Sequence, residues 1–177
     1  IFDDADLDAA VPFACMFPYA ATGQACIVPS RMLVHEGIYD EVVARVTAMV
    51  EAIALGDPFA EGGHTGPVIS MAARDRIQGI IAIAQQENAG RLIVGGQQKP
   101  GGAFAAGAYV TPTLFADVDP QSKLFCNEVF GPVLAISRFR DEQDAIALAN
   151  GTRFGLYSYL FTRDIGRAMR ILSLIHI

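Results

Sequence analysis

Residues 23–34, GQACIVPSRMLV, join a glycine turn to a short run of apolar residues. Gly23 permits a tight backbone turn, and the apolar run at 32–34 is typical of a buried strand. Ahead of the turn, apolar residues recur at helical spacing behind several aspartates, which predicts a helix over residues 6–20. The pattern around Cys26 is therefore helix, turn and strand, with the thiol on the turn.

The rest of the chain continues this alternation of helices and short strands. Further helices are expected behind Asp40, Ser70, Ser122 and Asp141 and over residues 165–172. The expected strands are RLIVGG (91–96), YVTPTLF (109–115), VLAISRF (133–139) and LYSYLF (156–161), and the glycine-rich stretch 97–108 is expected to be an exposed loop. This order favours an α/β fold with three layers and a mostly parallel central sheet, because crossover helices bury both faces of such a sheet.

Composition limits the class of protein to which the chain can belong. Its 177 residues are the size of one domain, and 52% hydrophobic with 18% charged residues predicts a folded chain. No apolar run approaches the roughly 20 residues that cross a bilayer. The net charge is −6 and the 13 basic residues are scattered, so we expect neither a membrane nor a nucleic acid as partner.

The cysteines and histidines indicate the compartment and argue against a metal centre. Cys15, Cys26 and Cys126 are odd in number and lack CxxC spacing, which favours free thiols in a reducing compartment and predicts a cytoplasmic protein. Cys15 and Cys126 have apolar neighbours and are expected to be packing residues. The three histidines lie too far apart for metal-ligand spacing, so no metal site is expected.

Cys26 has two interpretations from the residues alone. A cysteine attacks a carbonyl carbon as the thiolate, which nearby N–H donors or a cation favour. Arg31 lies across a strand-like run, so the sequence neighbours offer little activation, whereas Gly23 allows backbone N–H groups to approach a reacting oxygen. A lone cysteine in such surroundings is more often a small packing residue. The residues by themselves leave both interpretations open.

Several motifs together resemble those of the aldehyde dehydrogenase superfamily. GQACIVPSR (23–31) is similar to the active-site signature of that superfamily, G-Q-x-C followed by an arginine five residues after the cysteine. Further stretches occur in the same order: DDADLDAAV (3–11), GDP (56–58), GPVIS (66–70), YVTPTLF (109–115), EVFGPV (128–133), ANGTRFGL (149–156) and LFTRD (160–164). The resemblance covers residues 2–172 and implies the catalytic domain of such an enzyme.

This resemblance implies roles for individual residues. Cys26 matches the catalytic thiol, and its own backbone N–H would form half of the oxyanion hole. Glu128 matches the glutamate that hydrogen-bonds the nicotinamide ribose, and Phe130 matches its aromatic neighbour. Leu156 matches a residue that packs near the nicotinamide. The implied cofactor is NAD or NADP.

The implied reaction is oxidation of an aldehyde to a carboxylic acid through a cysteine thiohemiacetal and a thioester. Ala25 and Ile27 flank the thiol and would line the aldehyde pocket, where their small and aliphatic side chains suit an apolar substrate. The resemblance implies that the intact enzyme is a homodimer or a homotetramer.

The resemblance also implies that the chain is part of a longer enzyme. The sequence opens inside the acidic segment IFDDADLD without an initiator methionine. The superfamily carries its general-base glutamate in an E-L-G-G-K stretch just upstream of this point, and its second oxyanion donor and dinucleotide-binding domain lie further upstream. We therefore expect residues 1–172 to be the thiol-bearing catalytic domain, residues 173–177 to be an atypical tail, and the isolated chain to be inactive.

Two other interpretations stay open. In the first, the chain is a catalytically silent fragment or module that only binds a partner or oligomerises. The low fraction of charged residues and the upstream position of the base favour this interpretation. Alternatively it belongs to a thiol acyltransferase or esterase without nicotinamide, which would keep Cys26 and leave the EVFGP motif at 128–132 without a purpose.

Overall fold

The structure is a computed structural model of the chain and describes residues 1–59, 65–96 and 101–175. His64, His176 and part of the expected loop at 97–108 lie outside these residues. In chain order the elements are α1 (Leu7–Tyr19), the 3₁₀ helix η1 (Ala20–Gly23), β1 (Arg31–His35), η2 (Glu36–Ile38), α2 (Tyr39–Glu51), α3 (Met71–Gln86), β2 (Arg91–Val94), η3 (Gly102–Phe104), β3 (Thr113–Ala116), α4 (Lys123–Cys126), β4 (Val133–Phe139), α5 (Glu142–Asn150) and α6 (Ile165–Leu172).

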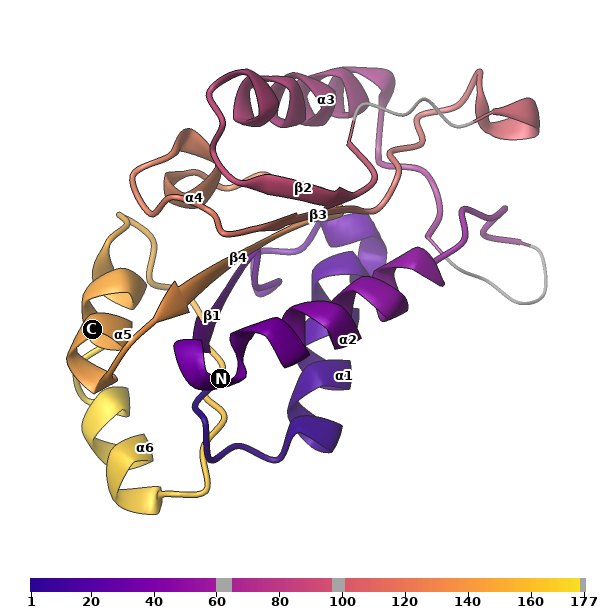
Figure 1. Cartoon of the computed structure of the whole chain (residues 1–177). Helices are drawn as coiled ribbons and strands as arrows, with labels where there is room; N and C mark the ends of the chain where they lie inside the picture. Colours follow the sequence, from indigo (N-terminus) through magenta and orange to yellow (C-terminus); the bar gives the residue numbers. More distant parts are fainter. Residues whose placement is uncertain (60–64, 97–100, 176–177) are drawn as a thin grey trace.

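The centre of the molecule is a four-stranded sheet in the order β1-β4-β3-β2 (Figure 1). β4 pairs in parallel with both β1 and β3, and β2 runs antiparallel to β3. The predicted α/β fold with a mostly parallel sheet is confirmed. β4 is the longest strand, and five of its seven residues pair with β1.

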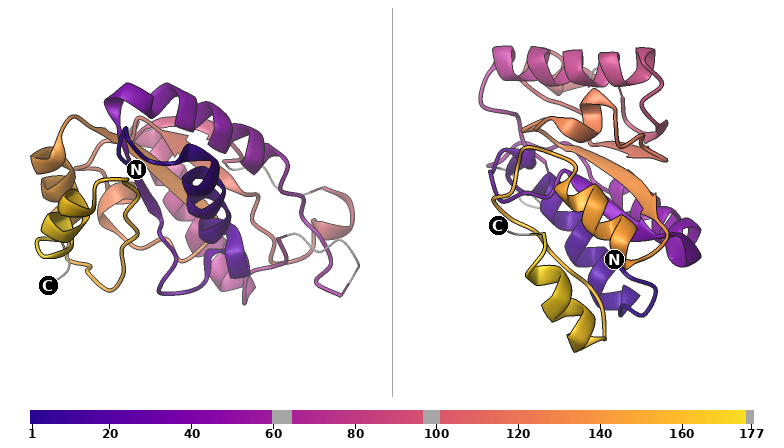
Figure 2. Two further views of the ribbon diagram at one scale, coloured as in Figure 1. Left: turned by 90° about the horizontal axis from the view of Figure 1, so that it is seen from below. Right: turned by 90° about the vertical axis from the view of Figure 1, so that its left-hand side faces the viewer.

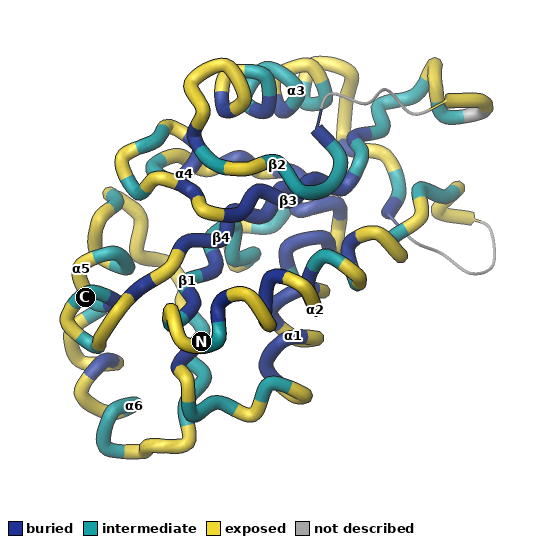
Figure 3. The backbone as a smooth tube through the Cα atoms, in the orientation of Figure 1, coloured by how far each residue is buried: buried dark blue, intermediate teal, exposed yellow. Residues whose placement is uncertain are grey.

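Helices cover both faces of the sheet (Figure 2). Along β4, Leu134 and Ile136 pack into one apolar cluster with residues of α1 and α2, whereas Val133 and Ala135 pack into a second cluster with residues of α3 and α4. This alternation follows from the two-residue period of a strand and explains why β4 is apolar nearly throughout. Figure 3 shows the buried residues gathered along β3 and β4, between the helices. α5 and α6 belong to a smaller third cluster near β1.

The helix starts predicted from the sequence are largely those of the structure. At each of five helix starts the N-cap side chain accepts a backbone N–H of the first turn: Asp6 for α1, Ser70 for α3, Ser122 for α4, Asp141 for α5 and Asp164 for α6. α2 begins at Tyr39 without a side-chain cap, and its first turn carries Asp40 and Glu41, whose charges suit a helix N-terminus.

The strand predictions need two corrections. The expected strand at 156–161 is wrong, because the structure has no ladder there and Phe161 accepts a single backbone hydrogen bond, from the Phe2 N–H at 3.0 Å. The expected strand at 109–115 begins only at Thr113, since Pro112 has no N–H to donate to a ladder.

Candidate active site

The thiol turn is a strained segment of backbone between α1 and β1. Ala21 and Thr22 adopt left-handed conformations, with φ of 48° and 56°, and Gly23 follows with φ of 71°. Such conformations are unfavourable for residues with a side chain, so the surrounding contacts must hold them. The turn leaves Cys26 exposed at the surface.

The side chain of Gln24 ties this turn to the segment that leads into α3. Its Oε1 accepts the Ile69 backbone N–H at 2.9 Å, and its Nε2 donates to Thr22 Oγ1. The Gln24 backbone N–H donates to the Ala21 carbonyl oxygen at 3.1 Å. Gln24 therefore holds the left-handed residues Ala21 and Thr22 by hydrogen bonds within the turn, and it links the turn to Ile69.

The EVFGP turn lies against the thiol turn. A Cβ on Gly23 would lie 2.1 Å from the carbonyl oxygen of Gly131, so the two backbones meet where neither has a side chain. Phe130 has a left-handed φ of 51°, and its carbonyl oxygen accepts a hydrogen bond from Arg76 Nη2 at 3.3 Å. Both turns are thus held by residues of α3 or of the segment just before it.

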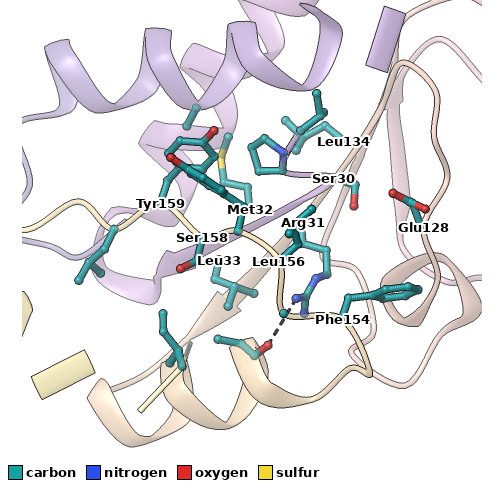
Figure 4. A pocket seen from close by; sticks show the side chains of 18 of the residues that line it. Ser30, Arg31, Met32, Leu33, Glu128, Leu134, Phe154, Leu156, Ser158 and Tyr159 are labelled. Atoms are coloured by element: carbon teal, nitrogen blue, oxygen red, sulfur yellow. Dashed lines mark hydrogen bonds between the residues drawn. The ribbon is translucent and has the colours of Figure 1, made fainter. Parts of the chain in front are cut away.

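A cavity of about 320 Å³ brings most of the predicted site residues together. Figure 4 shows two of them, Glu128 and Leu156, among the side chains that line it. Five of them line it: Ala25, Cys26, Glu128, Phe130 and Leu156. Ile27 is not among the lining residues; its side chain is partly exposed, and its carbonyl oxygen accepts the Tyr159 hydroxyl at 3.4 Å. The whole segment 154–161 also lines this cavity.

The sequence did not single out Arg31 as a residue of this cavity. Its guanidinium donates to the Leu148 carbonyl oxygen at 3.2 Å and to the Ala149 carbonyl oxygen at 3.4 Å, and it lies 4.8 Å from the centre of the Phe125 ring. These carbonyls form the C-terminal end of α5, which attracts positive charge. Burial lowers the pKa of Arg31, while the nearby Cys126 thiol opposes that shift. Arg31 is the first residue of β1, and its place in the GQACIVPSR stretch was the signal in the sequence.

Aromatic side chains form part of the cavity wall and were also missed. Phe13 of α1 meets the Tyr159 ring at 5.1 Å, and Tyr159 meets the Tyr157 ring at 4.9 Å. Tyr157 and Tyr159 alternate with Ser158 along an extended segment, and this spacing was the available signal. The resulting wall is apolar with a few hydroxyl groups.

The other two cysteines lie in different surroundings. Cys15 is fully buried in the cluster of α1 and α2, and burial raises the pKa of its thiol to about 11. Cys126 is half-buried, and its thiol donates to the Pro120 carbonyl oxygen at 3.3 Å. Among the described residues, no group of three or more histidine, cysteine, aspartate or glutamate side chains gathers as metal ligands would. No helix in the described ranges has the length and apolarity to span a membrane.

The model of the aldehyde dehydrogenase family matches residues 1–177. The chain belongs to this family. A betaine aldehyde dehydrogenase of Cereibacter sphaeroides is 40% identical over 173 residues, which make up 98% of this chain and 35% of that protein. A succinate semialdehyde dehydrogenase of Acinetobacter baylyi is 39% identical over 171 residues, with 97% of this chain and 34% of that protein covered.

Solved aldehyde dehydrogenases have the same fold. The aldehyde dehydrogenase of Bartonella henselae superposes with a TM-score of 0.93 at 37% identity, covering 98% of this chain and 36% of the other. A point variant of betaine aldehyde dehydrogenase from Staphylococcus aureus, solved in complex with NAD⁺, gives a TM-score of 0.93 at 34% identity, covering 99% of this chain and 36% of the other. The chain spans about a third of the length of the aldehyde dehydrogenases that it matches.

Proposed function

We propose that this chain carries the thiol of an NAD(P)-dependent aldehyde dehydrogenase that oxidises an aldehyde to its carboxylic acid. The observation that supports this most strongly is the cavity that Cys26 shares with Glu128, Phe130 and Leu156. These residues come from three separate turns of the chain. Because the chain belongs to the aldehyde dehydrogenase family, we interpret their shared cavity as the place where thiol, aldehyde and cofactor meet.

Cys26 is the nucleophile in this proposal. Its sulfur adds to the aldehyde carbonyl carbon, and backbone N–H groups of the turn, including that of Cys26, stabilise the oxygen that becomes negatively charged. Each such donor is worth about 3 kcal/mol to the transition state. The thioester that follows oxidation is hydrolysed by a water, which needs a general base. We place that base in polypeptide outside this chain, as the resemblance implies.

Three residues of the cavity suit one edge of a nicotinamide cofactor. Glu128 is an exposed carboxylate that can accept hydrogen bonds from ribose hydroxyls. Phe130 and Leu156 are 38% and 61% exposed and offer apolar surface to a ring. When bound, NAD or NADP accepts the hydride. The remainder of the cofactor pocket lies, in this proposal, in a dinucleotide-binding domain outside the chain.

The aldehyde lies beside Ala25 in this proposal, where the small side chain leaves room next to the sulfur. Ile27 does not line the cavity and is 42% exposed, so its place beside the aldehyde is proposed from the resemblance alone. Residues 1–172 are the thiol-bearing domain and 173–177 a tail. We further propose a dimeric or tetrameric enzyme in the cytoplasm, where free thiols such as these three persist.

A second candidate is that the isolated chain is silent and only associates with other protein. Ile165, Met169 and Leu172 of α6 follow one another at helical spacing and are 77%, 64% and 57% exposed. An exposed apolar stripe of this kind is typical of a surface that meets another protein. This candidate accounts for α6 but offers no reason for the residues around Cys26.

The test uses the whole enzyme to which this chain belongs, with NADH or NADPH formation from an aldehyde as the readout. Cys26→Ala is expected to lower the rate at least about 1000-fold, because the nucleophile is lost. Cys126→Ala is the matched control and is expected to keep the rate within a few-fold. Activity that persists in the Cys26→Ala enzyme rejects the thiol mechanism.

A further inference from the structure

Arg31 starts from a backbone position that the sheet fixes. It is the first residue of β1 and pairs with Ala135 of β4, and the Ser30 carbonyl oxygen just ahead of it accepts the Ala135 N–H at 2.9 Å. The turn that carries Cys26 leads into β1, and the turn that carries Glu128 leads into β4. Because β1 and β4 are parallel neighbours, the sheet itself places these two turns side by side, at the amino ends of the two strands.

The third turn of the site, residues 151–156 with Leu156 at its end, has no strand to hold it. It follows α5 and precedes a segment that belongs to no ladder. Within the described part of the chain, the hydrogen bonds of these residues reach no farther than Leu148, whose carbonyl oxygen accepts the Gly151 N–H at 3.2 Å. The turn therefore takes its position largely from the end of α5.

Arg31 holds that end of α5. Its Nη1 donates to the Leu148 carbonyl oxygen at 3.2 Å and its Nη2 to the Ala149 carbonyl oxygen at 3.4 Å. Figure 4 shows the Arg31 side chain directed into the cavity, with one of these bonds drawn as a dashed line. The last carbonyl oxygens of a helix lack α-helical partners and attract positive charge. A guanidinium can meet two neighbouring carbonyls at once with its fork of N–H groups, whereas an ammonium is a single point charge.

The same guanidinium lies against the segment ahead of Glu128. Its centre is 4.8 Å from the centre of the buried Phe125 ring, and Phe125 belongs to α4, just before that turn. A cation over an aromatic face is attracted by the ring. One side chain thus meets the approaches to all three turns: it lies in the strand that follows Cys26, it contacts α4 ahead of Glu128, and it bonds to α5 ahead of Leu156.

Arg31 keeps this place without a carboxylate partner. Burial lowers its pKa, the nearby Cys126 thiol opposes that shift, and no carboxylate of the described ranges contributes to it. A partly buried guanidinium costs free energy unless its hydrogen bonds are made, so the two carbonyls of α5 and the ring of Phe125 are what stabilise it there. The side chain therefore joins structural elements instead of forming an ion pair.

We propose that Arg31 is a positioning residue of the active site, which fixes the turn bearing Leu156 relative to the turns bearing Cys26 and Glu128. It acts through the end of α5 and the Phe125 ring. The consequence for the cofactor rests on the proposed function, in which Glu128 and Leu156 contact the nicotinamide and its ribose. The link from Arg31 to α5 stands without that function.

The thiol turn is held by contacts that do not involve Arg31, so two effects can be separated. Gln24 ties this turn to Ile69 whatever residue stands at position 31. Replacing Arg31 is therefore expected to loosen the turn bearing Leu156 and to weaken cofactor binding. The reactivity of the Cys26 thiol is expected to stay the same.

The first measurement is amide hydrogen exchange in the 177-residue chain. Arg31→Lys keeps the charge but loses the fork, so the Gly151 amide, whose acceptor lies at the freed end of α5, is expected to exchange at least about tenfold faster. The Ile81 amide inside α3 should change much less, which separates local loosening from global destabilisation. Arg140→Lys is the matched control, since Arg140 is exposed and bonds to Asp144, and it should change neither rate.

The second measurement is the cofactor affinity of the whole enzyme to which this chain belongs, read from the fluorescence of bound NADH or NADPH. Arg31→Lys is expected to raise the dissociation constant at least about tenfold, and Arg140→Lys to leave it within about twofold. The rate at which iodoacetamide labels Cys26 should stay within about twofold in both enzymes.

Phe125→Leu is a second variant, and it tests the same link if the Arg31→Lys chain does not fold. It removes the ring but keeps the bonds from Arg31 to α5. Cofactor binding should therefore weaken, while the Gly151 amide exchanges at its usual rate.

Each result decides the proposal. An unchanged Gly151 exchange rate in the Arg31→Lys chain would overturn the link to α5. Faster exchange with unchanged cofactor affinity would make Arg31 a stabilising residue only and overturn its positioning role. Because cofactor binding needs no thiol, an enzyme that stays active as Cys26→Ala but loses cofactor affinity as Arg31→Lys rejects the thiol mechanism and supports the role of Arg31. An unaltered enzyme that binds neither NADH nor NADPH overturns both proposals.

Discussion

Gly23 and Gly131 meet backbone to backbone: a Cβ built on Gly23 would lie 2.1 Å from the Gly131 carbonyl oxygen and 2.8 Å from the nitrogen of Pro132. The first glycine belongs to the turn that carries Cys26, and the second to the turn that carries Glu128. The distance between the two turns is therefore set by the absence of a side chain at residue 23.

Gly23→Ala is expected to destabilise the fold by about 2–4 kcal/mol, because the new methyl group overlaps backbone atoms and the residue keeps a positive φ. Thermal unfolding followed by circular dichroism measures the change. Gly79→Ala is the control: it lies inside α3 with nothing within 4 Å of its added Cβ, and it should stabilise the chain by about 0.5–1 kcal/mol. Equal melting temperatures for the two variants would contradict the contact.

Gln24→Leu is expected to loosen the thiol turn, since the Ile69 N–H loses its acceptor and Thr22 loses its donor. The expected cost is about 1–3 kcal/mol, the usual penalty for unmaking such bonds. The rate at which Cys26 reacts with an alkylating agent should change together with stability. Gln86→Leu, at the exposed end of α3, should alter neither quantity. A Gln24→Leu chain that unfolds and reacts as the unchanged chain does would show that the brace is unimportant.

The fold was more predictable than the site. Caps such as Ser70 and Asp141 and the apolar period of the helices are local signals, and they placed α3 and α5 to within a residue at their starts. The segment 156–161 has strand-forming residues, but a ladder needs a neighbour, and in this structure it has one backbone bond to Phe2. Strand pairing is a tertiary property that alternation alone does not specify.

The site combines residues that no local pattern connects. The meeting of Gly23 with Gly131 and the bond from Arg76 to the Phe130 carbonyl oxygen join parts of the chain that are far apart in sequence. The resemblance to a family pointed to the thiol and to Glu128, but not to the inward position of Arg31 or the outward position of Ile27. Both positions depend on tertiary contacts: Arg31 bonds to carbonyls at the end of α5, and the Ile27 carbonyl oxygen accepts the Tyr159 hydroxyl.

Asp4 joins the two ends of the chain in a pH-dependent way. Its carboxylate accepts hydrogen bonds from the Thr162 hydroxyl at 2.8 Å, the Arg163 N–H at 3.1 Å and Arg167 Nη1 at 2.9 Å. Partial burial raises the pKa of Asp4, but the Thr162 hydrogen bond and the Arg167 charge outweigh it and lower the pKa below its usual value. A lowered folded-state pKa means that this contribution is present above the unfolded pKa of about 3.9 and is lost as the pH falls through the folded value.

Asp4→Asn is therefore expected to lower the melting temperature by about 2–5 °C at pH 7, and the difference from the unchanged chain should shrink as the pH falls below about 4. Melting curves across pH 3–7 measure it. Asp3→Asn is the control and should lower the melting temperature less. The Asp3 carboxylate is half exposed and lies 3.8 Å from Arg167, which is farther than the 2.9 Å of Asp4. A difference that grows toward acid pH would contradict the assigned sign.

The reactivity of the three thiols toward limiting iodoacetamide at pH 8, read out by mass spectrometry of peptides, tests whether Cys26 is the nucleophile. Cys15 should stay unlabelled, since burial raises its pKa to about 11. Cys26 should be labelled at least about tenfold faster than Cys126, and an added aldehyde should slow the labelling of Cys26 alone by occupying its sulfur. Equal labelling of Cys26 and Cys126, or labelling of Cys26 that an aldehyde leaves unchanged, would contradict the account.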